Sequence, residues 1–109
     1  MEIETGHGTP GYLRQSEIKA AVAEVEQLLA PDVVHIRYEV THDWSGDWAV
    51  YFRVLLSDEA SKPPRLHEIA QTVEREMSDR LDFLELGLFY YFHYRSQSEQ
   101  NKIKEKIWA

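Results

Sequence analysis

The stretch Asp47-Trp48-Ala49-Val50-Tyr51-Phe52-Arg53-Val54-Leu55-Leu56 decides the fold. After Asp47 it carries a single charge, on Arg53, and it is rich in β-branched and aromatic residues, which suit a pleated and packed surface. An apolar run this short is typical of a strand covered on both faces. We therefore expect residues 47–56 to form the central strand of a sheet.

The residues before this run alternate between apolar and polar. Residues 33–40 place one set of side chains on each face of a strand, with Val34, Ile36, Tyr38 and Val40 on one side and His35, Arg37 and Glu39 on the other. The short segment 41–46 contains Gly46, so the two strands should form an antiparallel hairpin. We expect Val50, Phe52 and Val54 to lie beside Val34, Ile36 and Tyr38, with Ala49, Tyr51, Arg53 and Leu55 on the face of His35 and Arg37.

Two amphipathic helices flank the hairpin. The first has apolar residues at three- and four-residue steps, at Ile18, Ala21, Val22, Val25, Leu28 and Leu29. Ser16 can cap its start, and Pro31 ends it because the residue before a proline leaves the helical region. The second should begin near Pro63 and Pro64 and end within 79–82, with its stripe at Leu66, Ile69, Ala70, Val73, Met77 and Leu81.

A third strand of strong aromatic character is predicted over residues 86–94. It follows a helical crossover, so it can pair in parallel with the central strand. The predicted fold is an α+β two-layer sandwich of order α-β-β-α-β. Its three-stranded sheet has the order 1-2-3, and two helices cover one face. We expect a flexible lead at 1–13, one domain at 14–95 and a polar C-terminal tail at 96–109, which a short helix could occupy and Trp108 could anchor.

Composition excludes several classes of function. The chain has 109 residues, which fits one domain, and no cysteine, which excludes disulfides and thiolate chemistry. It has 19 acidic against 12 basic residues, a net charge of −7 that opposes broad binding to phosphate backbones. No apolar run approaches membrane-spanning length, and the N-terminus lacks the features of a signal peptide, so we expect a cytoplasmic protein. No phosphate-binding loop, dinucleotide fingerprint or activated nucleophile is present, so we predict no cofactor and favour a non-catalytic protein over an enzyme.

The sheet face opposite the helices would carry more apolar and aromatic surface than a small monomer usually exposes. Its predicted members are Tyr51, Arg53, Leu55, Phe89, Tyr91 and His93. The terminal segments, a partner protein or another copy of the chain should cover it. The preferred hypothesis is self-association through this face, by a non-catalytic interaction module.

Two alternatives use neighbouring residues. His35, Arg37, Arg53 and Tyr91 on an open sheet resemble the way some RNA-binding domains stack bases, although the chain is acidic and lacks a GXXG loop. His42, Asp43 and Asp47 are weak candidates for a metal site, and the second alternative is therefore a metal-dependent enzyme centred on the loop 42–47. The spacing does not match a calcium loop, and a hairpin turn explains these residue types more simply.

Two segments carry a family resemblance. Asp43-Trp44-Ser45-Gly46-Asp47 and Arg95-Ser96-Gln97-Ser98-Glu99-Gln100 together resemble small bacterial α+β proteins of uncharacterised function. The resemblance implies a small partner protein, such as an antitoxin-like member of a toxin–antitoxin pair. It implies no catalytic or binding residue.

Overall fold

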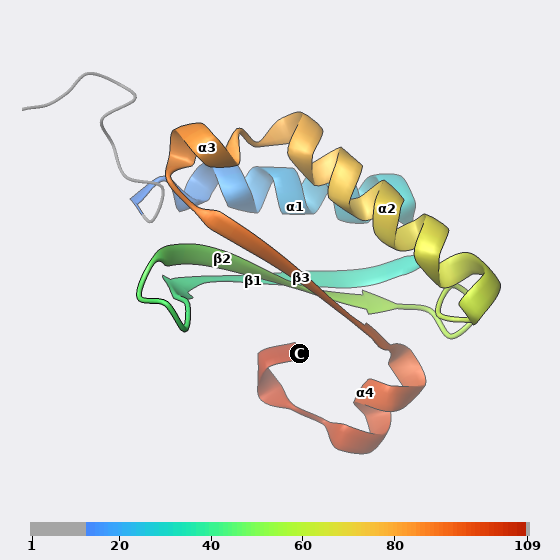
Figure 1. Cartoon of the computed structure of the whole chain (residues 1–109). Helices are drawn as coiled ribbons and strands as arrows, with labels where there is room; N and C mark the ends of the chain where they lie inside the picture. Colours follow the sequence, from blue (N-terminus) through green and yellow to red (C-terminus); the bar gives the residue numbers. More distant parts are fainter. Residues whose placement is uncertain (1–12, 109) are drawn as a thin grey trace, which may run out of the picture.

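The fold is known from a computed structural model, which describes residues 13–108. The elements are α1 (Gln15–Leu29), β1 (Val33–His42), β2 (Trp48–Leu56), α2 (Pro63–Arg80), α3 (Phe83–Leu86), β3 (Phe89–Ser96), α4 (Gln97–Ile103) and the 3-10 helix η3 (Lys106–Trp108). The sheet has the order β1-β2-β3, with β1 antiparallel and β3 parallel to β2. Helices α1 and α2 lie on the same face of this sheet (Figure 1). The predicted α+β sandwich, its element order and its sheet order are therefore confirmed.

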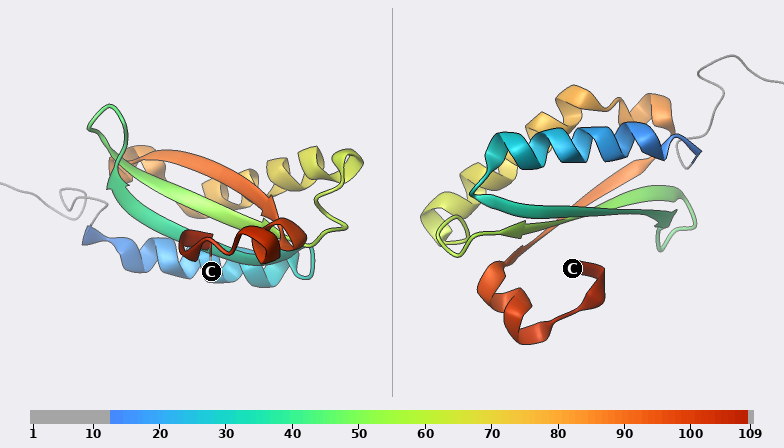
Figure 2. Two further views of the ribbon diagram at one scale, coloured as in Figure 1. Left: turned by 90° about the horizontal axis from the view of Figure 1, so that it is seen from below. Right: turned by 180° about the vertical axis from the view of Figure 1, so that it is seen from behind.

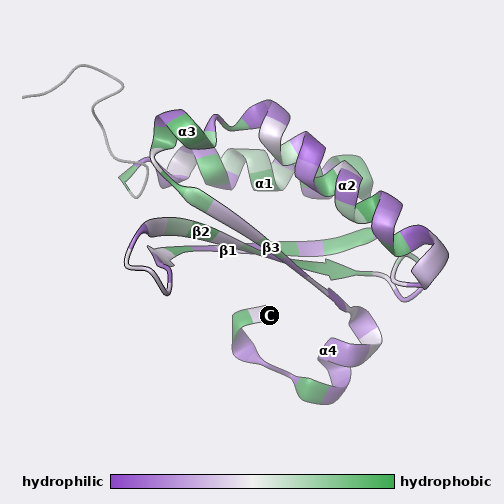
Figure 3. Ribbon diagram, viewed as in Figure 1, coloured by the Kyte–Doolittle hydropathy of each residue, from purple (hydrophilic) through white to green (hydrophobic). Residues whose placement is uncertain are grey.

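Strand β2 is the centre of the core, as its sequence predicted. Six of its nine residues are buried, because α1 and α2 cover one face and β1 and β3 flank both edges. Phe52 is fully buried, and its ring stacks on Phe92 of β3 at 4.8 Å. The helix faces turned to the sheet are hydrophobic, and their outer faces are mostly hydrophilic (Figure 3). The buried helix residues are Ile18, Ala21, Val22 and Val25 of α1 and Ile69, Val73 and Met77 of α2.

The predicted register of the hairpin is wrong at one position. A β-bulge between Val33 and His35 reverses the alternation there, so Val33 is buried and Val34 is largely exposed. The core side therefore pairs Ile36 with Val54, Tyr38 with Phe52 and Val40 with Val50. The expected pairing of the other face holds, since Arg37 lies opposite Arg53 and His35 opposite Leu55.

The third strand begins later than predicted. Leu86 lies in α3 because the Asp82 carboxylate accepts a 3.0 Å hydrogen bond from the Glu85 N–H and caps this short helix. Gly87 ends α3 with φ at 70°, a left-handed conformation that glycine adopts without steric cost. The chain then enters β3 at Phe89 and remains extended to Ser96.

The helix boundaries match the prediction more closely. Helix α2 runs from Pro63 to Arg80, as expected. Helix α1 begins at Gln15, with Arg14 at the N-cap position and no side-chain cap bond. Ser16, the predicted cap, therefore lies inside the first turn. No helix within residues 13–108 is long and apolar enough to cross a membrane.

The C-terminal segment, residues 97–108, folds back onto the face of the sheet opposite the helices. Its two helical pieces and the chain between them form a curved layer beneath the strands (Figures 1 and 2). Ser96 caps α4 through a 3.1 Å bond from the Glu99 N–H, and Trp108 is buried. The predicted N-terminal lead falls outside the described residues except for Leu13.

Candidate interaction surfaces

The sheet face opposite the helices, here the open face, carries rows of side chains that cross all three strands. The register places Ala49 beside Phe89, Tyr51 beside Tyr91, Arg53 beside His93 and Leu55 beside Arg95. On β1 the matching residues are Thr41, Glu39, Arg37 and His35. The residues predicted for the interaction face therefore do share one side of the sheet.

The C-terminal segment covers one end of the open face. The Arg95 guanidinium lies 4.4 Å from the centre of the Trp108 ring and forms a 2.6 Å ion pair with Glu105. Arg37 donates a 3.0 Å hydrogen bond from Nη1 to the main-chain oxygen of Lys106. Leu55 is only 6% exposed as a result. Leu55 is thus part of an internal contact, and the available part of the predicted face is smaller than expected.

The hairpin loop between β1 and β2 is organised around the Asp43 carboxylate. Its Oδ1 accepts hydrogen bonds from the N–H and hydroxyl of Ser45 and from the Asp47 N–H, at 2.9, 2.6 and 3.1 Å. Its Oδ2 accepts a 2.8 Å bond from the Tyr91 hydroxyl of β3. The hydrogen bond from the Ser45 hydroxyl, together with the one from the Tyr91 hydroxyl, stabilises the charged carboxylate and lowers the pKa of Asp43. The same bond to Asp43 raises the pKa of the Tyr91 hydroxyl.

The weak metal candidates therefore have other contacts. The His42 ring packs against Trp48 at 4.0 Å, and both oxygens of Asp43 accept bonds within the loop and from β3. Within residues 13–108, no group of three or more histidine and acidic side chains is arranged to hold a metal ion.

The candidates for nucleic-acid binding also have intramolecular partners. His35 contacts Glu26 through Nδ1 at 2.9 Å, and Arg53 forms a 2.9 Å ion pair with Glu39. Arg37 and Tyr91 make the contacts already described. Beside them, Tyr51 stacks on Tyr91 with ring centres 5.0 Å apart. The four predicted residues share the open face, but it is partly filled by the chain itself.

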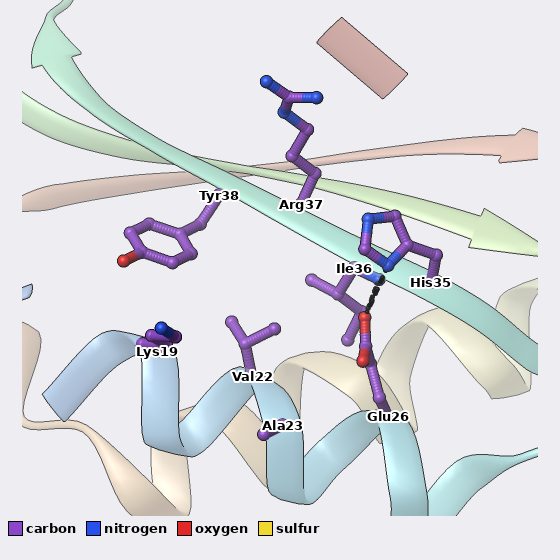
Figure 4. Close-up of a pocket in the computed structure, with 8 residues that line it drawn as sticks. All are labelled: Lys19, Val22, Ala23, Glu26, His35, Ile36, Arg37 and Tyr38. Carbon is purple, nitrogen blue, oxygen red and sulfur yellow. Dashed lines mark hydrogen bonds and ion pairs between the residues drawn. The ribbon is translucent and has the colours of Figure 1, made fainter. Parts of the chain in front are cut away.

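The two free edges of the sheet differ in how they are protected. At the β1 edge, the Glu26 carboxylate of α1 accepts a 2.5 Å hydrogen bond from the main-chain N–H of Ile36 (Figure 4). A charged acceptor there opposes the approach of another strand, as in other natural sheets with guarded edges. Figure 4 also shows Arg37 pointing away from α1, toward the opposite side of the sheet.

Strand β3 lacks such protection. None of its eight residues is buried, and its sequence, Phe-Tyr-Tyr-Phe-His-Tyr-Arg-Ser, contains no acidic residue, lysine or proline. Leu84 is 92% exposed, Phe89 is 57% exposed, and both line an apolar hollow of about 220 Å³. Trp44, 89% exposed, occupies the hairpin loop at the same end of the molecule (Figure 1). We call the outer side of β3 together with Leu84 the β3 edge surface.

Sequence reasoning finds only part of this surface. Phe89 is among the predicted residues. Leu84 is not, because the pattern gives no short helix directly before the strand, and Tyr90 is not, because alternation assigns it to the helix side of the sheet. The acidic residues Asp82 and Glu85, three positions apart, carry the available signal, since this spacing is typical of a helix start.

Comparison with known proteins gives a fold and no family. No protein-family model matches the chain, and no curated protein matches its sequence. One similar solved structure is that of "MamM CTD - Copper form". It superposes with a TM-score of 0.54 at 12% sequence identity, covering 76% of this chain and 85% of that one. The similarity extends to the fold alone.

Proposed function

We propose that this protein is a non-catalytic interaction module that associates with a second copy of itself through the β3 edge surface. The observation that carries the proposal is an eight-residue aromatic strand at the margin of the sheet, with no residue buried. An exposed hydrophobic edge presents unpaired main-chain groups that another strand can use. The similarity to "MamM CTD - Copper form" supports the fold on which this proposal rests.

A second copy is a chemically suitable partner. Two β3 strands that pair antiparallel about a two-fold axis meet aromatic against aromatic, a favourable cross-strand combination. The only formal charge of the strand, Arg95, is already paired with Glu105. The strand itself therefore adds no unpaired formal charge where the copies would meet.

The area that a stable dimer must bury shows how much of the β3 edge surface has to take part in the contact. A half-exposed aromatic side chain offers on the order of 100 Å², and a stable interface buries about 800 Å² on each partner. Phe89 and Tyr90 alone do not reach this area, so pairing would extend along the strand and include Leu84. A lysine placed within the strand should consequently disrupt the whole contact.

The test uses the full chain and light scattering coupled to size-exclusion chromatography across a range of concentrations. We expect a dimer that the double substitution Phe89→Lys and His93→Lys converts to a monomer. Val34→Lys, on the guarded β1 edge, is the matched control and should leave the dimer intact. A wild-type chain that stays monomeric up to ~1 mM would exclude useful self-association. That result would favour a separate protein partner, such as the toxin-like protein that the sequence resemblance suggests.

A dimer that survives the double substitution would overturn the assignment to β3. A dimer lost equally in Val34→Lys would show a nonspecific effect of added charge and would also contradict the proposal.

A further inference from the structure

A cleft lies between the C-terminal segment and the end of the open face that this segment covers. Its volume is about 460 Å³, within the range of pockets that hold small molecules. His35 and Leu55 line it from the sheet, and Lys104, Lys106 and Trp108 line it from the C-terminal segment. Figure 2, seen from below, shows the helical pieces of this segment lying across the strands.

The charge of this cleft is opposite to that of the protein. The chain has 19 acidic and 12 basic residues, yet the lining contains two lysines and a histidine and no carboxylate. Glu105, the nearest acidic residue in the chain, pairs with Arg95 instead. Neither Lys104 nor Lys106 forms an ion pair with any residue in the described part of the chain. His35 contacts Glu26, so the uncompensated positive charge in this lining is that of the two lysines.

The sheet beside the cleft adds to this positive potential. Arg37 lies directly opposite Arg53. Like charges at opposed positions destabilise a sheet, and the ion pair between Arg53 and Glu39 offsets part of this repulsion. Arg37 is bonded to the main-chain oxygen of Lys106, in the wall of the cleft.

The other lining groups indicate the shape of the ligand. Leu55 and Trp108 form the apolar part of the lining. Each is only 6% exposed, and Arg95 packs against the Trp108 ring. Gln97 and Asn101 add amide groups at the margin. Ligand pockets commonly combine an apolar lining with a few polar groups that fix orientation. We infer that this cleft binds a small organic anion with a flat apolar body and a phosphate or carboxylate group held by Lys104 and Lys106.

The experiment is a titration of the full, isotope-labelled chain followed by two-dimensional NMR. The probes are adenosine monophosphate and 1-naphthoate, with uncharged adenosine and inorganic phosphate for comparison. We expect both organic anions to shift the Trp108 indole N–H and the amides of residues 104–106. Binding should weaken as salt is raised, because exposed charge interactions are screened. The oligomeric state, followed in parallel by light scattering, makes this result independent of the proposed self-association.

The variant Lys104→Gln with Lys106→Gln should raise the dissociation constant at least tenfold. The control variant, Lys19→Gln with Lys62→Gln, removes the same charge elsewhere on the protein. Its dissociation constant for the organic anions should stay within twofold of the wild-type value. If neither organic anion shifts these signals at concentrations up to ~10 mM, the inference is overturned. It is also overturned if the Lys104 and Lys106 variant binds the anions as tightly as the wild type. Adenosine binding as tightly as its monophosphate would refute the role of the charge, and phosphate binding as tightly as both organic anions would refute the role of the apolar surface.

Discussion

Replacing Trp108 by alanine tests whether the C-terminal segment is held on the sheet. Trp108 is 6% exposed although it stands one residue from the end of the chain. Burying a large apolar side chain contributes about 1.5–3 kcal/mol, and a partly desolvated cation–π contact such as that with Arg95 contributes about 1 kcal/mol. The total cost is limited because the segment 97–108 can detach while the rest of the sheet stays folded.

We therefore expect Trp108→Ala to lower the free energy of unfolding by about 2–3 kcal/mol, a value set by burial and by the aromatic contact. Urea unfolding followed by circular dichroism measures this change. Hydrogen exchange should show a larger local effect at the Lys104 amide, which donates a 2.7 Å hydrogen bond to the Gln100 carbonyl oxygen.

The adjacent residue provides a matched control. Ile107 is 45% exposed, so Ile107→Ala should cost less than about 1 kcal/mol. If the two alanine variants lose the same stability, or if the Trp108 variant keeps the exchange rates of the wild type, burial of the indole does not hold the segment and the reasoning fails.

Two further predictions concern the hairpin loop. The pKa of Asp43 is lowered in the folded chain, so its carboxylate stabilises the fold above its ordinary pKa near 3.8, and this contribution is lost as the pH falls through the lower folded value. The stability difference between wild type and Asp43→Asn, from urea unfolding at several pH values, should therefore shrink below pH ~4; a constant difference would contradict the carboxylate's role. Gly46 has φ at 89° and open space around its Cβ position, so Gly46→Ala should cost about 1 kcal/mol from the backbone alone. Thermal unfolding would measure the loss, and an alanine variant as stable as wild type would show that the loop relaxes.

The central strand could be predicted from the sequence because nearly all of its residues are apolar, whichever face they lie on. Residues 48–56 are apolar on both faces, and neither a shift in register nor a change in neighbours alters the need to bury them. The helix stripes are similarly robust, since Ile18, Val25, Val73 and Met77 repeat at helical spacing and are all buried.

The errors occur where one residue changes the outcome. The bulge at Val33 and His35 depends on how β1 meets the end of β2, and strict alternation gives no sign of it. The placement of Leu86 depends on whether Gly87 continues a strand or ends a helix. Asp82 decides this by capping α3, a local hydrogen bond that outweighs the strand-like composition of the residues that follow.

The predicted interaction surface moved for a different reason. Its aromatic residues lie on the predicted face, and the C-terminal segment, one of the possible covers considered from the sequence, lies over one end of that face. Once Trp108 and Arg95 are packed together, Leu55 is internal and that end of the open face is filled. Composition indicates how much apolar surface needs cover, and it does not say which part of the chain supplies that cover.

The C-terminal segment also determines how the two proposals relate. By covering one end of the open face, it leaves the margin of the sheet as the place where the aromatic residues of β3 remain accessible. The same segment places Lys104 and Lys106 in one cleft with His35 and Leu55 of the sheet, which gives the acidic chain a cleft lined by two lysines. A ligand bound in that cleft would contact both the sheet and the segment, and would therefore stabilise the docked arrangement in which Leu55 is hidden. Anion binding and pairing through β3 should consequently be compatible, whereas self-association through the whole open face would require the segment to leave.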